Sequence, residues 1–341
     1  MHMADALLSP AVGLTMDAVS AGALAWTVAN VKKDGLADKK IPLMGIGGAL
    51  VFAAQMINFT IPGVGASGHI TGGILLAGLL GGMPAFLSIS AVLIIQCLFF
   101  ADGGLLALGC NIFNMGVIPC LIIYPLLFKP LLKKRLNYRR LSLAAFASAV
   151  IGLEAGALCV IWQTLISGVT VLPYGTFMAL MLPIHLAIGI VEGLVTAAIL
   201  CYIYKTRPDI LINAHIAEEA GNGVINNVLA ALAALTIVAA CGLSLFASAY
   251  PDGLAWALGK AAGAAELPAP GGIYAGAAAI QQSLAFLPDY GLSTAGAEAA
   301  PLARSVSGLL GAGIICALAA AAAFSVSMIK RAKKRSLAAG K

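Results

Sequence analysis

Apolar stretches long enough to cross a bilayer as helices recur along almost the whole chain, and they decide its class. Of the 341 residues, 61% are hydrophobic and 10% are charged, whereas soluble domains carry about 25% charged residues. Backbone inside a bilayer must satisfy its own hydrogen bonds, so such stretches form helices. The alternating segments of an outer-membrane barrel are absent from the sequence. The sequence therefore predicts an all-α integral membrane protein.

Basic residues indicate the topology. Lys and Arg gather at residues 32–40, 129–140, 205–207 and 330–335, and short basic loops stay in the cytoplasm. About nine transmembrane helices, with the N-terminus outside and the C-terminus inside, place each cluster on the cytoplasmic side and leave only Lys260 and Arg304 outside. The net charge of +6 thus reflects topology and does not indicate nucleic-acid binding.

The expected helices follow the apolar runs. They cover residues 10–30, 42–57, two short helices within 74–100 divided at 81–84, 108–128, 141–167, 176–204, 226–249 and 304–329. Residues 58–73 are too rich in Gly and Pro for a helix and too apolar for an ordinary loop. Irregular backbone at membrane depth is tolerated where it lines a cavity, so we expect a re-entrant or deeply tucked segment.

A polar linker at residues 205–224 divides the chain. It separates a seven-helix core, residues 1–220, from a two-helix module, residues 221–341, whose extracytoplasmic segment covers about residues 250–302. Of the four histidines, His215 falls in this linker and is expected to be solvated.

The first two residues, Met1 and His2, form a potential chelator. The α-amine of Met1, the main-chain nitrogen of His2 and its imidazole can close on one divalent cation through two fused rings. One further imidazole would complete a planar four-nitrogen set, which nickel(II) and copper(II) favour. The alternative interpretation is a disordered start.

His69 is the candidate fourth ligand, because it lies in the Gly-rich segment expected on the same side as Met1. Glycines allow close approach of another chain segment. The alternative is a histidine that hydrogen-bonds inside the bundle. Asn58, Ser67 and Thr71 flank His69 and either orient it or satisfy unpaired backbone groups.

His185 and Glu192 lie two turns apart on one face of a predicted helix. A charged residue at the centre of a membrane helix costs about 2.5–3.5 kcal/mol, so buried ionisable residues are often functional. The other interpretation is that both pair with polar groups of neighbouring helices and stabilise packing.

Several common chemistries have no motif here. The sequence contains neither the G-x-x-x-x-G-K-[ST] motif of a P-loop ATPase nor the H-E-x-x-H motif of a zinc protease. Its seven Cys include no CxxC pair, and we interpret them as buried hydrophobic residues.

Taken together, these motifs resemble the substrate-binding membrane component of energy-coupling-factor transporters for nickel and cobalt. The matching segments are Met1-His2, Asn58-Phe-Thr-Ile-Pro-Gly63, Ser67-Gly-His-Ile-Thr-Gly-Gly73, Ala101-Asp-Gly-Gly-Leu105, Leu108-Gly-Cys-Asn-Ile-Phe-Asn-Met-Gly116 and His185-Leu-Ala-Ile-Gly-Ile-Val-Glu-Gly193. The resemblance covers about residues 1–220. It implies that the metal is held by the Met1 amine, the main-chain nitrogen and imidazole of His2, and His69.

Residues from about 226 onward resemble the small two-span subunit of the same systems, here fused. Pro251-Asp-Gly-Leu-Ala255 is similar to the Pro-Asp-Gly-Leu-Glu signature of its nickel-type version, but departs from it at Ala255.

The resemblance implies a metal-binding subunit of an ATP-driven Ni(II) importer in the bacterial plasma membrane, with no organic cofactor. Its expected partners are a transmembrane coupling protein and cytoplasmic ATP-binding subunits, besides the surrounding lipid. Co(II) uptake for cobalamin synthesis is the alternative substrate. A stand-alone proton-coupled permease, with Glu154, Glu192 and His185 as a proton relay, is the second class of function. An embedded enzyme or sensor ranks last, because no nucleophile–base pair is evident.

Overall fold

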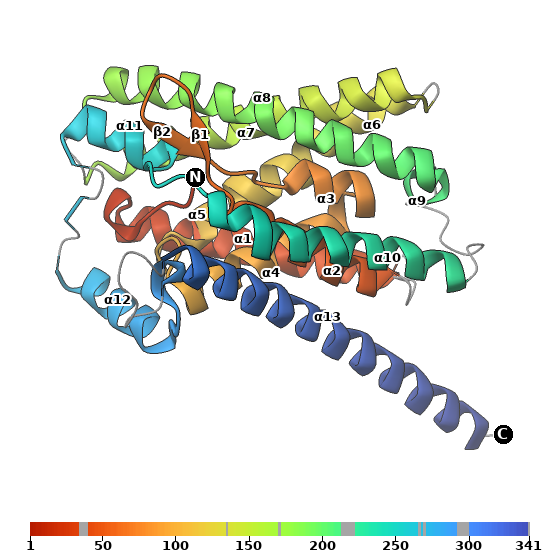
Figure 1. Cartoon of the computed structure of the whole chain (residues 1–341). Helices are drawn as coiled ribbons and strands as arrows, with labels where there is room; N and C mark the ends of the chain where they lie inside the picture. Colours follow the sequence, from red (N-terminus) through yellow and green to blue (C-terminus); the bar gives the residue numbers. More distant parts are fainter. Residues whose placement is uncertain are drawn as a thin grey trace.

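Most of the apolar stretches form long helices that pack side by side (Figure 1). The computed structural model describes residues 1–33, 40–133, 136–169, 172–212, 222–264, 267–268, 271–291 and 300–339. The α-helices are α1 (Pro10–Lys33), α2 (Lys40–Gln55), α3 (Gly73–Leu80), α4 (Gly82–Phe100), α5 (Leu108–Ile112), α6 (Lys129–Leu132), α7 (Tyr138–Ser167), α8 (Tyr174–Thr206), α9 (Pro208–Ile212), α10 (Asn222–Ile237), α11 (Gly253–Ala262), α12 (Ile273–Leu284) and α13 (Ala300–Ala339).

Segments of 3-10 helix and π-helix also occur. They are η1 (Asp5–Leu7), η2 (Phe113–Phe128), η3 (Val238–Gly242), η4 (Leu243–Phe246) and η5 (Pro288–Tyr290). The stretch η2 is a π-helix that contains Pro119 and Pro125. Proline lacks a backbone N–H and cannot continue the regular α-helical ladder, so these prolines favour the wider winding between α5 and α6.

Seven helices of the described residues are long and apolar enough to cross a membrane, and each matches one of the predicted spans. The other two predicted spans are shorter: α2 has 16 residues and α3 has eight. Gly72 and Gly81 flank α3, with φ angles of 79° and 86°. This backbone region favours glycine, and it ends the helix. The number of crossings and their orientation stay predictions.

Residues 58–73 contain a hairpin that the sequence reasoning did not predict. Its strands β1 (Phe59–Ile61) and β2 (Ala66–Gly68) pair antiparallel, with Phe59 opposite Gly68. Gly63 and Gly65 make the turn with φ of 82° and 72°. The segment is therefore non-helical as expected, but it is ordered by its own strand pairing.

The segment at residues 250–302 contains the short helices α11 and α12. The two parts of the chain share one bundle, since both α10 and α13 pack on α2. His215 lies outside the described residues.

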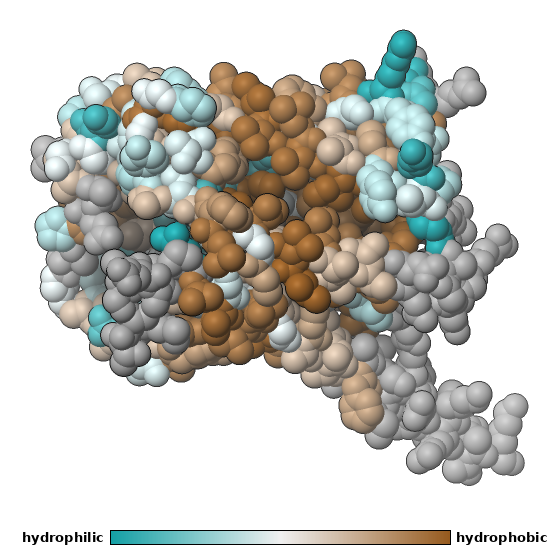
Figure 2. Space-filling model, in the orientation of Figure 1, coloured by the Kyte–Doolittle hydropathy of each residue, from teal (hydrophilic) through white to brown (hydrophobic). Residues whose placement is uncertain are grey.

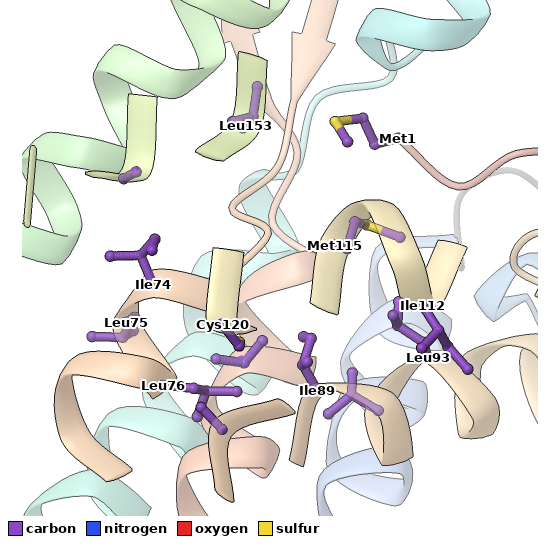
Figure 3. Packing of buried hydrophobic residues seen from close by; sticks show 14 of the residues in the cluster. Met1, Ile74, Leu75, Leu76, Ile89, Leu93, Ile112, Met115, Cys120 and Leu153 are labelled. Atoms are coloured by element: carbon purple, nitrogen blue, oxygen red, sulfur yellow. The ribbon is translucent and has the colours of Figure 1, made fainter. Parts of the chain in front are cut away.

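The hydrophobic core encloses the N-terminus and the whole of α3. Figure 3 shows the Met1 side chain entering this core, with Leu153 and Met115 nearby, and Ile74, Leu75 and Leu76 of α3 packed below. Burial of the first residue means that the chain starts inside the bundle.

On the face shown in Figure 2, an apolar band lies between two more polar ends. Several large apolar side chains of the chain are strongly exposed, for example Ile166 at 73% and Phe246 at 85%. The N-terminus, α11 and α12 lie at one end, and α6, α9 and the C-terminus at the other (Figure 1). A belt of exposed apolar side chains around apolar helices of this length is typical of contact with lipid, and the chain is a multi-pass membrane protein.

Packing of α13 on α2 depends on a close contact at Gly311. A Cβ added there would lie 2.0 Å from the Phe52 ring, whereas one added at Gly313 would meet nothing within 4 Å. We expect Gly311→Ala to lower the free energy of unfolding by about 1–3 kcal/mol, the usual cost of overpacking. Thermal unfolding of the purified protein in detergent measures this, with Gly313→Ala as the matched control. Equal melting temperatures for the two variants would contradict the packing described.

Candidate metal centre

The N-terminus is anchored inside the bundle by its first three residues. Met1 is 4% exposed, and a Cβ added at Gly156 of α7 would lie 2.8 Å from its Cε atom. The main chain of Met3 donates to Oδ1 of Asn111 at 2.8 Å and accepts from Gly104 N at 2.8 Å. These contacts hold the α-amine at a defined place.

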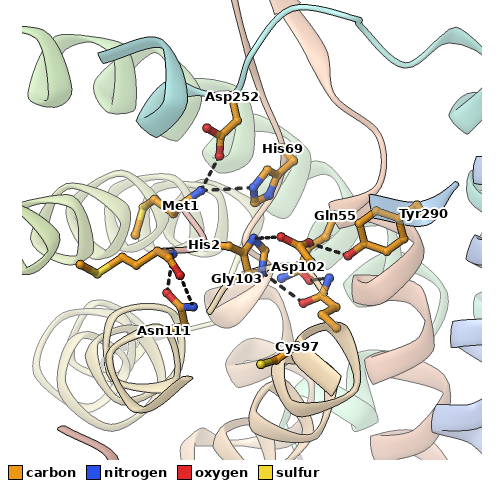
Figure 4. A network of polar contacts seen from close by, with 12 residues as sticks. Met1, His2, Gln55, His69, Cys97, Asp102, Gly103, Asn111, Asp252 and Tyr290 are labelled. Carbon is orange, nitrogen blue, oxygen red and sulfur yellow. Dashed lines mark hydrogen bonds and ion pairs between the residues drawn. The ribbon is translucent and has the colours of Figure 1, made fainter. Parts of the chain in front are cut away.

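The structure brings the three predicted ligand residues together (Figure 4). The Met1 nitrogen lies 3.4 Å from Nε2 of His69. The rings of His2 and His69 are stacked, with centroids 5.4 Å apart and an angle of 27° between their planes. Hairpin β1–β2 carries His69 to this position directly after β2.

A fourth residue, Asp252, completes the surroundings of the amine. Its Oδ2 accepts a hydrogen bond from the Met1 nitrogen at 3.0 Å, and its Oδ1 accepts from Ala255 N at 2.8 Å and so caps α11. Sequence reasoning missed this role and noted Asp252 only as part of the Pro251-Asp-Gly-Leu-Ala255 segment. The available signal was its place before Gly253, since Asp is a preferred residue at a helix N-cap.

Asp252 is placed by contacts between its own segment and the hairpin. Ser67 donates from its main-chain N to Pro251 O and from Oγ to Tyr250 O, both at 2.8 Å. Ser248 N donates to Asn58 O at 2.6 Å. The predicted neighbours Ser67 and Asn58 therefore bind the C-terminal part of the chain. The side-chain oxygen of Asn58 is buried and has no hydrogen-bond partner within the described ranges.

The imidazole of His2 is held by groups that the sequence reasoning did not identify. Its Nε2 lies 3.2 Å from Oε1 of Gln96 on α4. Its Nδ1 lies 3.4 Å from Oδ1 of Asp102, whose Oδ2 accepts from the Tyr290 hydroxyl at 2.5 Å. Tyr290, like Asp252, comes from the C-terminal part of the chain, and Figure 4 shows both approaching the N-terminus.

Two glutamines connect the His2 side of the site to the His69 loop. Gln96 Nε2 donates to Gln55 Oε1 at 2.7 Å, and Gln55 Nε2 donates to the Thr71 carbonyl at 2.9 Å. A chain of satisfied buried hydrogen bonds rigidifies the groups that it joins. The separation between the two histidines is thus set by residues of α2 and α4.

Glu192 fixes the other side of this loop. Its carboxylate accepts from Thr71 N at 2.8 Å, from Thr71 Oγ1 at 2.7 Å and from Gly72 N at 3.0 Å. This geometry favours the interpretation in which Glu192 stabilises packing. His185 bonds through Nδ1 to the Met181 carbonyl at 2.7 Å and lines a small pocket beside Met1 and His69.

Burial controls the charge of the site. Desolvation lowers the pKa of His2 and lowers that of His69 to about 3. The neighbouring Met1 ammonium lowers both pKa values further. Burial raises the pKa of the Asp252 carboxyl, but the Met1 ammonium and His69 outweigh it and hold the pKa below its usual range. The site therefore presents neutral imidazoles beside an ammonium–carboxylate pair.

Side chains alone do not make a metal site here. Within the part of the chain that the structure describes, no three His, Cys, Asp or Glu side chains are grouped closely enough to hold an ion. A cation bound here would need the main-chain nitrogens of Met1 and His2 as well as the imidazoles.

Known protein families match most of the chain. Residues 2–210 match the model of the cobalt uptake substrate-specific transmembrane region, and residues 226–328 match the PDGLE domain. A fused nickel transport protein of Rhodobacter capsulatus is 30% identical, over 93% of this chain and 95% of its own length. A cobalt transport protein of Geobacter sulfurreducens is 28% identical over 65% of each chain.

Two crystal structures of transition metal transporters also resemble the chain. One is 29% identical with a TM-score of 0.55 and covers 65% of this chain and all of the other. The second, a truncated transporter, is 30% identical with a TM-score of 0.53 and covers 60% of this chain and 99% of the other. By these matches, the chain belongs to the family of cobalt uptake substrate-specific transmembrane proteins and carries a PDGLE domain behind that region.

Proposed function

We propose that this protein is the metal-capturing membrane subunit of an ATP-driven importer for Ni(II). Four nitrogens would hold the ion: the Met1 amine, the main-chain nitrogen of His2, the His2 imidazole and the His69 imidazole. The observation that carries the proposal is the insertion of the free amine beside His69, with the His2 ring stacked on the same imidazole.

Metal capture would replace two contacts of this structure. A small chelate ring through the His2 main chain requires Nδ1 of its imidazole, which here faces Asp102 at 3.4 Å. The amine that would bind the ion faces Asp252 at 3.0 Å. Both carboxylates lie at the rim, with side chains 24% and 25% exposed, whereas those of Met1 and His2 are 2% and 8% exposed. Carboxylates would thus attract the cation, and nitrogens behind them would bind it.

The donor set favours nickel. Planar nitrogen sites suit Ni(II), and a relative that matches almost the whole chain is a nickel transport protein. Co(II) uptake for cobalamin synthesis by the same mechanism is the alternative, because a cobalt transport protein resembles the first two thirds of the chain.

Energy for import would come from other chains. The sequence contains no P-loop motif, and the family resemblance implies a transmembrane coupling protein and cytoplasmic ATP-binding subunits. The Glu192 carboxylate already accepts hydrogen bonds from Thr71 and Gly72. These bonds argue against a role as a proton carrier.

Removal of either imidazole tests the ligand set. We expect His2→Ala and His69→Ala each to weaken Ni(II) binding by at least about 100-fold, more than changes to surrounding groups usually do. One alanine inserted before Met1 should have a similar effect, because it moves the imidazole away from its chelate ring. Equilibrium dialysis of protein that still inserts into membranes measures this. Stoichiometric nickel in both histidine variants would refute the proposal.

Proton release tests which nitrogens bind. The imidazoles are neutral at neutral pH, since burial lowers the pKa of His69 to about 3, so they release no protons. The Met1 ammonium and the His2 amide should release about two protons per Ni(II), and affinity should therefore fall as pH is lowered. Titration calorimetry in buffers of different ionisation heat counts these protons. A count of zero would contradict binding through the amine.

Uptake assays test the energy source. We expect nickel uptake by cells that contain the coupling and ATP-binding subunits to stop on ATP depletion and to tolerate a protonophore. Cells that make this chain alone are the control. Uptake by the lone chain that a protonophore abolishes would instead identify a proton-coupled permease.

A further inference from the structure

A small pocket beside the amine contains one imidazole that the four-nitrogen site does not use. The pocket is lined by Met1, His69, Thr71, His185 and Asp252, among others, and its volume is about 10 Å³. That is close to the smallest space that holds one water molecule, so a cation that enters it would have to shed most of its hydration shell.

His185 faces this pocket in a state that suits metal binding. The side chain is 2% exposed, and its Nδ1 lies 2.7 Å from the Met181 carbonyl oxygen. A carbonyl can only accept, so Nδ1 carries the hydrogen and Nε2 of the neutral ring carries a lone pair. Within the described ranges, the structure gives Nε2 no hydrogen-bond donor. Metal-ligating histidines have this pattern, with the other ring nitrogen bonded to a carbonyl or carboxylate.

The start of α11 covers the imidazole. A Cβ added at Gly253 would lie 3.1 Å from Cε1 and 3.4 Å from Nε2 of His185. The residue before it is Asp252, whose side chain is 24% exposed and whose Oδ2 holds the Met1 amine. A cation that reaches the Asp252 carboxylate from solvent therefore meets His185 in the same pocket as the amine.

We propose that Nε2 of His185 and the carboxylate of Asp252 form a transit position, where a divalent cation is held briefly before it passes to the four-nitrogen site. This proposal rests on the proposed function. Two protein ligands with water hold a cation more weakly than four nitrogens. His69 lines the same pocket, but no three His, Cys, Asp or Glu side chains of the described residues are grouped closely enough to hold an ion together. A weakly held cation next to the four-nitrogen site can pass on to that site and is not retained at the transit position.

A transit position changes the rates of metal association and dissociation and leaves the Kd unchanged. This distinguishes it from a structural role. In stopped-flow mixing of CoCl₂ or NiCl₂ with the purified full-length protein, we expect His185→Gln to slow association and dissociation together by roughly tenfold. Such a factor corresponds to about 1.4 kcal/mol at the barrier. The Kd should stay the same. With Co(II), an early visible-absorption species should be present in the unaltered protein and absent in the variant.

Two further variants make the test decisive. Gly253→Ala places a methyl group against the His185 ring and should slow both rates without any change on α8. Thr196→Val is the control, because Thr196 is buried on the same helix and its hydroxyl has no partner within the described residues. Unchanged rates in His185→Gln and Gly253→Ala, or a raised Kd with unchanged association, would overturn the transit position. Absence of binding by the unaltered protein would instead defeat the proposed function.

Discussion

The buried free amine of Met1 is the interaction on which the rest of the site depends. A charged group removed from water is costly unless it is paired and hydrogen-bonded. Here Asp252 pairs with it and His69 lies beside it, while the thioether of Met1 fills space left by Gly156. The first residue thus joins three elements that are far apart in the sequence. A different start to the chain would leave a carboxylate and an imidazole without their partner.

The amine also explains why the two parts of the chain share one core. Asp252 is supplied by the PDGLE domain, and Tyr290 from the same domain holds Asp102 beside His2. The same part of the chain also packs closely on α2 through α13, for example at Gly311 and Phe52. In this fused chain the second domain therefore encloses the N-terminus, and the proposed chelator lies at the boundary between the two family regions.

Polar groups around the site are arranged by exposure. The carboxylates of Asp102 and Asp252 lie at the rim, and the imidazoles lie behind them. Neutral side-chain amides connect His2 to the His69 loop. Gln55 and Gln96 use their amides to span the distance without adding charge, and Glu192 holds the loop by accepting hydrogen bonds from Thr71 and Gly72. An ion that enters would exchange oxygen ligands for nitrogen ligands as it moves inward. The proposed transit position at His185 is an intermediate step in that exchange.

The sequence by itself determined the membrane class and most helix positions, because bilayer crossing depends on composition. It also indicated the grouping of Met1 and His2 with His69, because a chelate of this kind depends on adjacent atoms of the first two residues and one further imidazole. Hairpin β1–β2 and the helices α11 and α12 could not be predicted, since apolar Gly-rich segments have no clear period. Only the tertiary structure decided that Asp252, Asp102, Gln55 and Gln96 surround the chelator. These residues lie on separate elements with ordinary local patterns, and their shared role arises from long-range packing that brings the two ends of the chain to one pocket.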